Sequence, residues 1–301
     1  MQTACRYKKC FVSLQKAFIP MKHLNRLIFS VIAVAAVFAM GGCSQKSTDL
    51  KLISFNIRYN SWNNIDGENG WPYRKDAVVK MIREERPAAI GLQEALIDQL
   101  LYLDSCLPEY RRIGVGRDDG KEAGEFMAIY YDTARLKLTA TFTQWLSETP
   151  YEPSLGWDAA CRRTVTFARF DDRLSGKEFV YLNTHLDHVG QIARAESAKQ
   201  IAGSAPMDKS YPVILGGDMN STIEDTIFNS FYAMGLQAAR EMTDSTSHAI
   251  TYNAYGNEEG KVIDHFFVKG CKVVSFRTLD GDYGVPYISD HYPIEIVISI
   301  E

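Results

Sequence analysis

Apolar and polar positions along most of the chain follow the patterns of short β-strands. These segments are rich in Val, Ile, Phe and Tyr and are bounded by Gly, Pro, Asp or Asn, as strands separated by turns are. Three other segments repeat apolar residues every three or four positions, which predicts helices at residues 74–86, 96–107 and 191–201. We expect strands at residues 50–57, 88–92, 110–115, 126–131, 136–145, 162–170, 178–184, 211–215, 262–268, 272–278 and 292–300. Many strands with few helices predict one α+β domain, residues 50–301, with two packed sheets and helices outside them.

The first fifty residues have a different character. Two basic residues precede an apolar run at residues 27–40, and two glycines and Cys43 follow it. This order resembles a bacterial lipoprotein signal peptide. We therefore expect residues 1–42 to be an upstream extension and a removed signal, Cys43 to carry the lipid, and residues 43–49 to be a tether. An uncleaved membrane anchor is the alternative. In both cases the domain is attached to a bacterial membrane and faces the periplasm or the cell exterior.

Charge and cysteine content narrow the class of protein. Residues 1–42 contain six basic and no acidic residues, so their removal from a chain with 33 basic and 37 acidic residues leaves a net charge of −10. A long nucleic acid needs a basic stripe to replace its counterions, so the charge disfavours that partner. Cys106, Cys161 and Cys271 remain after Cys43. Their odd number and the lack of a CxxC pair argue against a disulfide framework and a zinc site, and we expect them to be buried packing residues.

Polar side chains of the kinds that bind metals and phosphate occur in six segments at expected strands: four segments follow a strand, one lies inside a strand, and one directly precedes the last strand. Each has an ordinary alternative, because Asn and Asp often form turns and a lone His is often structural. Loops at one edge of a sandwich can bring strand ends together, so we expect the six segments to converge. The residues are Asn56, Glu94, His185 with Asp187 and His188, Asp218 with Asn220, Asp264, and Asp290 with His291.

These residue types suit the hydrolysis of a phosphate ester. Mg²⁺ prefers oxygen ligands and keeps several waters, so a few carboxylates and amides are enough to hold it. An imidazole held by a carboxylate stays protonated and can donate a hydrogen bond to a phosphoryl oxygen. The chain contains no GxSxG motif for a serine nucleophile.

In this order, the six segments resemble the endonuclease/exonuclease/phosphatase superfamily, and the resemblance covers residues 50–300. It implies a four-layer α/β/β/α sandwich in which two mixed, mostly antiparallel sheets are flanked by helices. It also implies hydrolysis of phosphomonoesters or phosphodiesters with Mg²⁺ or Mn²⁺. Asn56 and Glu94 would bind the metal, and Asp290 would assist with the metal or a water.

The same resemblance assigns roles to the remaining strand-end residues. Asp218 would orient or deprotonate the attacking water, and Asn220 would bind the scissile phosphate. Asp264 would hold His291 against the phosphate. His185 would contact the phosphate or assist the leaving group.

Other polar and aromatic residues are candidates for substrate contacts. Arg162 and Arg163 open an expected strand, so one of them would face the phosphate and the other solvent, in an order that the pattern does not decide. The remaining candidates are Trp62, Trp71, Arg74, His188 and Arg194. A helix cap or a surface charge explains His188 and Arg194 nearly as well, and packing explains the aromatic residues of the loop after Asn56 equally well.

The sequence therefore favours a monomeric, lipid-anchored phosphatase or phosphodiesterase outside the cytoplasm, acting on a phosphorylated small molecule or a lipid headgroup. An extracytoplasmic nuclease with the same chemistry is the alternative. A non-catalytic binding lipoprotein is a third reading. It is disfavoured because every expected catalytic position is filled.

Overall fold

A computed structural model describes residues 48–204, 211–244 and 249–300. The expected lipid site at Cys43, the expected signal peptide and most of the expected tether lie outside these residues. Within the described ranges, every helix is too short or too polar to span a membrane. By their contacts, Thr48–Glu301 form one compact unit.

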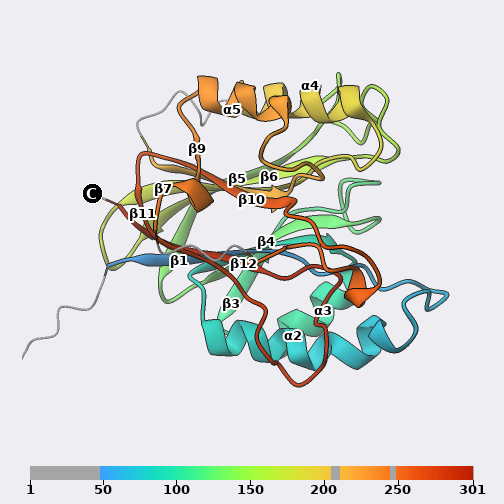
Figure 1. Ribbon diagram of the computed structural model, residues 1–301. Coiled ribbons are helices and arrows are strands. Elements are labelled where there is room, and N and C mark those ends of the chain that lie inside the picture. Colours follow the sequence, from blue (N-terminus) through green and yellow to red (C-terminus); the bar gives the residue numbers. More distant parts are fainter. Residues whose placement is uncertain (1–47, 205–210, 245–248, 301) are drawn as a thin grey trace, which may run out of the picture. The chain divides into compact units, whose positions relative to one another are not determined.

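Two six-stranded sheets lie face to face in the middle of the unit (Figure 1). The first has the order β11-β12-β1-β2-β4-β3, and the second β5-β6-β7-β8-β10-β9. Each sheet has one parallel pair, β1 with β2 and β7 with β8, and its other pairs are antiparallel. The strands are β1 (Leu50–Asn56), β2 (Ala89–Ala95), β3 (Tyr110–Ile113), β4 (Phe126–Asp132), β5 (Leu136–Trp145), β6 (Thr164–Asp172), β7 (Glu178–His185), β8 (Val213–Asp218), β9 (Gln237–Ala238), β10 (Asp264–Lys269), β11 (Lys272–Thr278) and β12 (Ile294–Ser299).

Helices cover the outer face of each sheet, which confirms the four-layer α/β/β/α sandwich (Figure 1). On one side lie α2 (Trp71–Glu85) and α3 (Ile97–Cys106), and on the other α4 (Gln191–Ala202) and α5 (Asn229–Ala233). Short 3-10 helices occur in the loops, namely η1 (Gly67–Asn69), η3 (Thr226–Phe228), η4 (Ala239–Glu241) and η5 (Ala254–Gly256).

The expected strands and helices are all present, and their ends differ from expectation by no more than three residues. Helix α2 starts earlier than expected because Pro72 stands in its first turn, where a missing backbone N–H costs nothing. Strand β9 and helix α5 were not predicted, because elements of two and five residues are too short to show a repeating pattern of apolar positions.

Apolar side chains fill three layers: one between the sheets and one under each pair of helices. Polar groups from β7 also cross between the sheets. The hydroxyl of Tyr181 donates to the carbonyl oxygen of Ile53 at 2.7 Å and accepts from the backbone N–H of Gly91 at 3.1 Å. A Cβ atom at Gly91 would lie 2.8 Å from this hydroxyl, so glycine permits the close approach. The contact fixes β7 against β1 and β2, so the two parallel pairs end at the same edge.

Candidate active site

The carboxyl ends of the two parallel pairs bring the predicted site residues together. In the strand registers, Asn56 lies opposite Gln93, and His185 lies opposite Asp218. Asp264 pairs with Asp218 from the other side of β8. Pairing alone therefore places an amide, an imidazole and two carboxylates at one edge of the sandwich.

Asn56 joins the two sheets at the base of the site. Its Nδ2 atom donates to Glu94 Oε1 and to Asp218 Oδ2, both at 3.0 Å. The Oγ atom of Ser289 lies 2.7 Å from the carbonyl oxygen of Asn56 and 3.1 Å from Asp290 Oδ1. These bonds link Glu94, Asp218 and Asp290 through Asn56 and Ser289.

The two predicted histidines lie on either side of Asp218. Its Oδ2 atom is 3.3 Å from Nε2 of His185 and 3.6 Å from Nε2 of His291. Nδ1 of His291 lies 2.9 Å from Asp264 Oδ2, and Nε2 of His185 lies 2.9 Å from Nδ2 of Asn220. All five residues therefore belong to one network.

The surroundings give the two imidazoles different protonation states at neutral pH. Burial lowers the pKa of His291, but Asp264 and Asp218 outweigh it and raise that pKa to about 10. Burial lowers the pKa of His185 well below its ordinary value, and the positive charge of Arg163 lowers it further. Burial also raises the pKa of Asp218 to about 7, against the lowering effect of His291. The site thus holds a cationic imidazole, a neutral imidazole and a carboxylate that titrates near neutrality.

The oxygen atoms on the Glu94 side suit a hard divalent cation. Glu94 and Asp290 are mostly buried and share one positive partner, Arg58, whose Nη1 lies 3.9 Å and 3.8 Å from their carboxylates. Burial raises the pKa of Asp290, and the charge of Glu94 raises it further. A cation would relieve this crowding, and carboxylate oxygens suit Mg²⁺. The residues that would hold it are Glu94 and Asp290. Asn56, expected as a ligand, instead turns its Nδ2 toward Glu94 and Asp218, and its Oδ1 accepts the backbone N–H of Arg58 at 3.0 Å, so its amide positions the carboxylates.

A second group of metal-ligand type lies beside it. Asp218, Asp264 and His291 each offer one ligand atom, and these atoms lie within 4.8 Å of one another. This cluster could also hold a metal. Since His291 carries a proton that Asp264 stabilises, this group suits a phosphate and a water better than a cation.

Three residues of the site have left-handed backbone conformations that non-glycine residues rarely adopt. Their φ angles are 57° at Arg58, 61° at Glu94 and 48° at Asn220. Each costs on the order of 1–2 kcal/mol, so the surrounding structure must hold them in place. The strain lies where Glu94 and Asn220 turn inward from their strands.

The network opens into a pocket of about 500 Å³. Of the predicted residues, its lining includes Glu94, Arg163, His185, His188, Asp218, Asn220, Asp290 and His291. Nine other lining residues were not predicted as site residues, namely Arg58, Tyr59, Arg117, Glu125, Cys161, Tyr252, Glu258, Lys261 and Ile263. Glu125 had a visible signal, because it directly precedes an expected apolar strand; most of the others lie in loops without a pattern.

Arg117 and Glu125 form a paired wall of the pocket. Two guanidinium nitrogens donate to the two carboxylate oxygens at 2.6 Å and 2.8 Å. Burial raises the pKa of Glu125 to about 7 and the charge of Glu94 adds to this, while Arg117 opposes both. The pair therefore presents a guanidinium and a titratable carboxyl group to a bound substrate.

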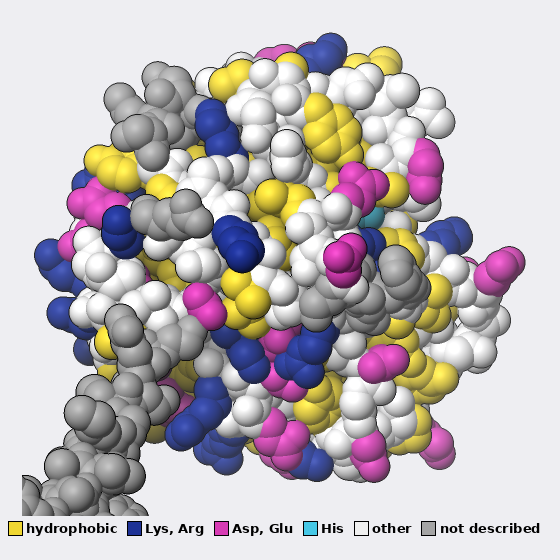
Figure 2. Space-filling model, turned by 60° about the vertical axis from the view of Figure 1, so that its left-hand side comes forward, with side chains coloured by type: hydrophobic (Ala, Val, Ile, Leu, Met, Phe, Trp, Pro, Cys, Tyr) yellow, Lys and Arg dark blue, Asp and Glu magenta, His cyan; other side chains and the backbone are white. Residues whose placement is uncertain are grey.

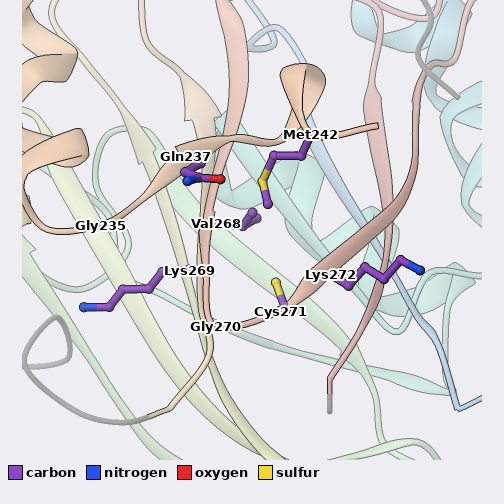
Figure 3. A pocket seen from close by; sticks show the side chains of 8 residues that line it. All are labelled: Gly235, Gln237, Met242, Val268, Lys269, Gly270, Cys271 and Lys272. Carbon is purple, nitrogen blue, oxygen red and sulfur yellow. The ribbon is translucent and has the colours of Figure 1, made fainter. Parts of the chain in front are cut away.

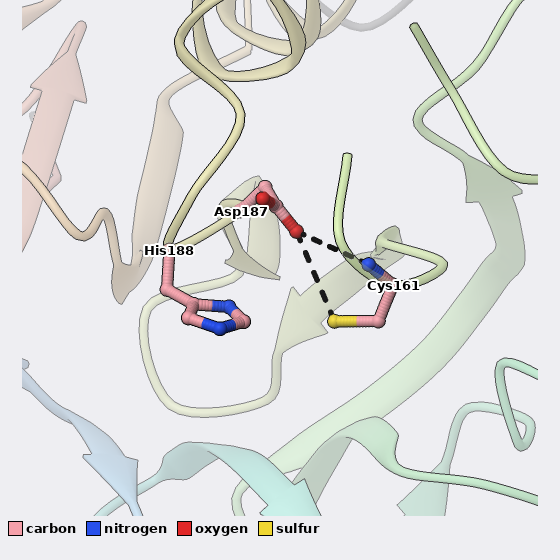
Figure 4. Close-up of side chains that lie close together, drawn as sticks. All are labelled: Cys161, Asp187 and His188. Atoms are coloured by element: carbon pink, nitrogen blue, oxygen red, sulfur yellow. Dashed lines mark hydrogen bonds between the residues drawn. The ribbon is translucent and has the colours of Figure 1, made fainter. Parts of the chain in front are cut away.

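Cys161, Asp187 and His188 cluster at the rim, and the interactions drawn among them join Asp187 to Cys161 (Figure 4). The Asp187 carboxylate accepts backbone N–H groups on both oxygens and the Nε–H of Arg163 at 3.2 Å. Burial raises the pKa of Asp187, but these donors bring it well below its usual range. Both carboxylate oxygens of Asp187 already accept hydrogen bonds, and one of them pairs with the guanidinium of Arg163. Asp187 therefore positions Arg163 and is not free to bind a metal. Nη2 of Arg163 also lies 3.0 Å from Nδ1 of His188.

The structure decides between the two adjacent arginines. Arg163 is buried and lines the pocket, whereas Arg162 lies outside the lining and pairs with Asp118 at 3.3 Å. The expected division into one inward and one outward side chain holds, although β6 begins only at Thr164. Arg194 also lies outside the lining and donates to the backbone oxygen of Asp187 at 2.8 Å.

Trp71 and Arg74, expected to contact substrate, lie behind the pocket and do not line it. Trp71 is buried against Tyr102, and the Arg74 guanidinium packs 5.2 Å from the Trp71 ring. The N–H groups of Arg74 donate to backbone carbonyl oxygens, so Arg74 positions these backbone segments and does not contact the substrate. Trp62 is 95% exposed and reaches solvent.

The expectation of buried cysteines was wrong: Cys106, Cys161 and Cys271 are free and half-buried. Cys271 lines a separate hollow of about 370 Å³ between β9, β10 and β11 (Figure 3). The side chains of Lys269 and Lys272 extend in opposite directions there. The described lining of this hollow contains neither His nor an acidic residue, so it offers none of the chemistry found at the strand ends.

Comparison with known proteins agrees with this geometry. The family model described as "Endonuclease/Exonuclease/phosphatase family" matches residues 53–291. The chain belongs to this family. Members of the endonuclease/exonuclease/phosphatase family are hydrolases that act on phosphoester or nucleic-acid substrates and are generally dependent on a divalent metal.

Three similar proteins illustrate the family. A family member from Bacteroides vulgatus is 34% identical, with a TM-score of 0.77 and coverage of 85% of this chain and 100% of its own. A mannosyl-6-phosphatase from Bacteroides thetaiotaomicron is 32% identical, with a TM-score of 0.76 and coverage of 83% and 100%. An uncharacterized protein of Acanthamoeba polyphaga mimivirus is 24% identical over 277 residues, which is 83% of this chain and 100% of that protein.

Proposed function

We propose that this protein is a Mg²⁺-dependent hydrolase of phosphate esters that acts outside the cytoplasm on a small phosphorylated molecule, held to a bacterial membrane by a lipid on Cys43. One observation carries the proposal. A cationic His291, a neutral His185 and the oxygen atoms of Glu94 and Asp290 face one pocket of about 500 Å³. This arrangement offers positive charge and hydrogen-bond donors to a phosphate beside ligands for a hard cation.

The side chains around Asp218 supply the steps of hydrolysis. Asp218, with a pKa of about 7, orients the attacking water and accepts its proton. His291, kept protonated by Asp264, donates to a phosphoryl oxygen on which negative charge develops. Asn220 binds the phosphate next to His185. A bound Mg²⁺ would neutralise phosphate charge and favour ionisation of a water.

The remaining lining favours a small substrate over a long nucleic acid. Tyr59 and Tyr252 offer aromatic faces, Glu258 places a carboxylate in the wall, and Glu125 presents a carboxyl group paired with Arg117. Carboxylates repel a continuous phosphate backbone but accept hydrogen bonds from sugar hydroxyls. The similarity to a mannosyl-6-phosphatase makes a sugar phosphate the first substrate to test.

A panel of phosphate esters tests the proposal. Mannose 6-phosphate, inositol phosphates, p-nitrophenyl phosphate and bis-p-nitrophenyl phosphate would be assayed with Mg²⁺, beside plasmid DNA and RNA. We expect release of phosphate from at least one small ester, loss of activity with a chelator, and recovery with excess Mg²⁺. Rapid degradation of plasmid at physiological salt would instead favour the nuclease. Inactivity on every substrate would refute the hydrolase.

A further inference from the structure

The two ends of the sandwich differ in what they present. The parallel strands β1, β2, β7 and β8 all end at the pocket, with Asn56, Glu94, His185 and Asp218 as the markers. Their first residues lie at the opposite end, which we call the proximal pole and define by residues 48–51, 134–137 and 172–178. In Figure 1 the start of β1 lies on the left, and its other end points toward the loops on the right. The chain therefore enters the domain at the pole farthest from the pocket.

An ion-paired arginine fixes this point of attachment. Nη2 of Arg135 donates to the backbone oxygens of Thr48 and Asp49, at 2.7 Å and 3.3 Å. The same guanidinium pairs with the buried carboxylate of Asp172 at 2.5 Å. The residues just before β1 are therefore held on the proximal pole rather than free to extend the tether.

The lengths of tether and strand then decide which surfaces the pocket can reach. Between Cys43 and Thr48 the chain makes five Cα steps, which span at most about 17 Å at roughly 3.4 Å each. Strand β1 alone separates the proximal pole from the pocket by about 20 Å at roughly 3.3 Å per residue. A lipid at Cys43 would therefore hold the proximal pole near the membrane, because turning the pocket toward the membrane would need a longer tether.

The charge of the proximal pole agrees with this orientation. Arg173 and Lys177, in the turn between β6 and β7, are exposed, as is Lys272 at the start of β11. Figure 2 turns this end toward the viewer and shows dark blue basic side chains over its described surface, with acidic ones between them. Each basic residue near an anionic bilayer contributes about 1 kcal/mol of attraction. The protein as a whole is acidic, so the location of these residues matters more than the total charge.

We propose that the anchored protein stands with its proximal pole on the membrane and its active site facing away, so that it takes soluble phosphate esters from the aqueous space and not headgroups of its own membrane. This rests on the proposed lipid anchor and on the proposed hydrolase function. It narrows the substrate from small or lipid-linked molecules to soluble ones.

Energy transfer to the membrane tests the orientation. The mature chain, which begins at lipidated Cys43, would be placed in phosphatidylethanolamine/phosphatidylglycerol vesicles containing an acceptor-labelled lipid. A donor dye would be attached at Leu174→Cys on the proximal pole or at Trp62→Cys, three residues after the pocket-lining Tyr59, with the three half-buried cysteines replaced by Ala. Both positions are exposed, at 45% and 95%, so neither change disturbs the core. We expect transfer from position 174 to be several-fold more efficient than from position 62. Equal or reversed efficiencies would overturn the orientation.

An activity comparison separates this inference from the proposed function. The vesicle-bound chain and an unlipidated Cys43→Ala chain should hydrolyse a soluble ester at rates within about two-fold of each other. A loss of more than ten-fold on vesicle binding would show a pocket blocked by the membrane and overturn the orientation. Inactivity of both forms on every soluble ester would refute the hydrolase, while energy transfer would still decide which pole faces the bilayer.

Discussion

Replacing Arg74 should disturb the active site indirectly, by releasing the backbone segments that carry its residues. The buried guanidinium holds three segments together by donating to four backbone oxygens: those of Ile57, Arg58, Asn69 and Ile288. Two of these segments carry site residues, Arg58 after β1 and Asp290 before β12. Burial lowers the pKa of Arg74, and the charges of Tyr255 and Asp290 counter this. Arg74→Met should therefore alter the spacing of the cation ligands without touching the substrate.

The expected size of the effect follows from these contacts. All four carbonyl oxygens lose their bonds to Arg74. That of Arg58 keeps a second donor, Gln99 Nε2 at 2.9 Å, so three are left without a side-chain donor among the described contacts. Each buried carbonyl left unpaired costs about 1–3 kcal/mol, and removal of a buried charge returns part of that. A net loss of about 2–4 kcal/mol corresponds to a fall in Tm of about 5–15 °C for a domain of this size.

Kinetics distinguish positioning from a purely structural role. A displacement of about 1 Å can cost roughly 100-fold in rate, so kcat/KM of Arg74→Met should fall about 10–100-fold well below its Tm. The Mg²⁺ concentration for half-maximal activity should rise, and Arg74→Lys should be intermediate. Arg83→Met is the matched control, because exposed Arg83 on the same helix donates only to the Cys106 oxygen, at 2.8 Å, among the described contacts. A folded Arg74→Met with normal kcat/KM and Mg²⁺ dependence would refute this reasoning.

Three further predictions concern the pocket itself. Because Asp264 and Asp218 raise the pKa of His291 to about 10, activity should fall as the pH rises through about 10. Asp264→Asn should move this alkaline fall in activity to lower pH. A pH–rate profile in which the fall does not move would contradict the prediction. Asp218→Asn should reduce kcat at least about 100-fold, since the attacking water loses its proton acceptor. Scanning calorimetry should show a Tm near that of the parent protein. A near-normal rate would exclude Asp218 as the base. Glu94→Gln should weaken Mg²⁺ binding, measured by titration calorimetry, about ten-fold or more. His291→Gln is the control and should leave Mg²⁺ binding nearly unchanged. Equal effects in the two variants would place the cation elsewhere.

Buried strand ends carry most of what could be predicted without coordinates. Strands such as β1 and β8 are buried on both faces, so their apolar runs were visible, and a polar residue at the end of such a run stands out. Asn56, Glu94 and Asp218 were found in this way, and His291 because it directly precedes the last expected strand. Arg58, Arg117 and Lys261 escaped notice because charged residues in loops usually have no role beyond solubility.

The sequence by itself determined the kinds of element, their order and the residues able to bind a cation and a phosphate, because these depend on local periodicity and side-chain chemistry. Only the tertiary structure decided which of those residues meet. Arg163 rather than Arg162 faces the pocket, Arg74 binds backbone instead of substrate, and Asp187 is occupied by backbone N–H groups. The physical reason is that a charged side chain acts through whatever lies within about 4 Å of it, and those neighbours come from segments far apart in the chain.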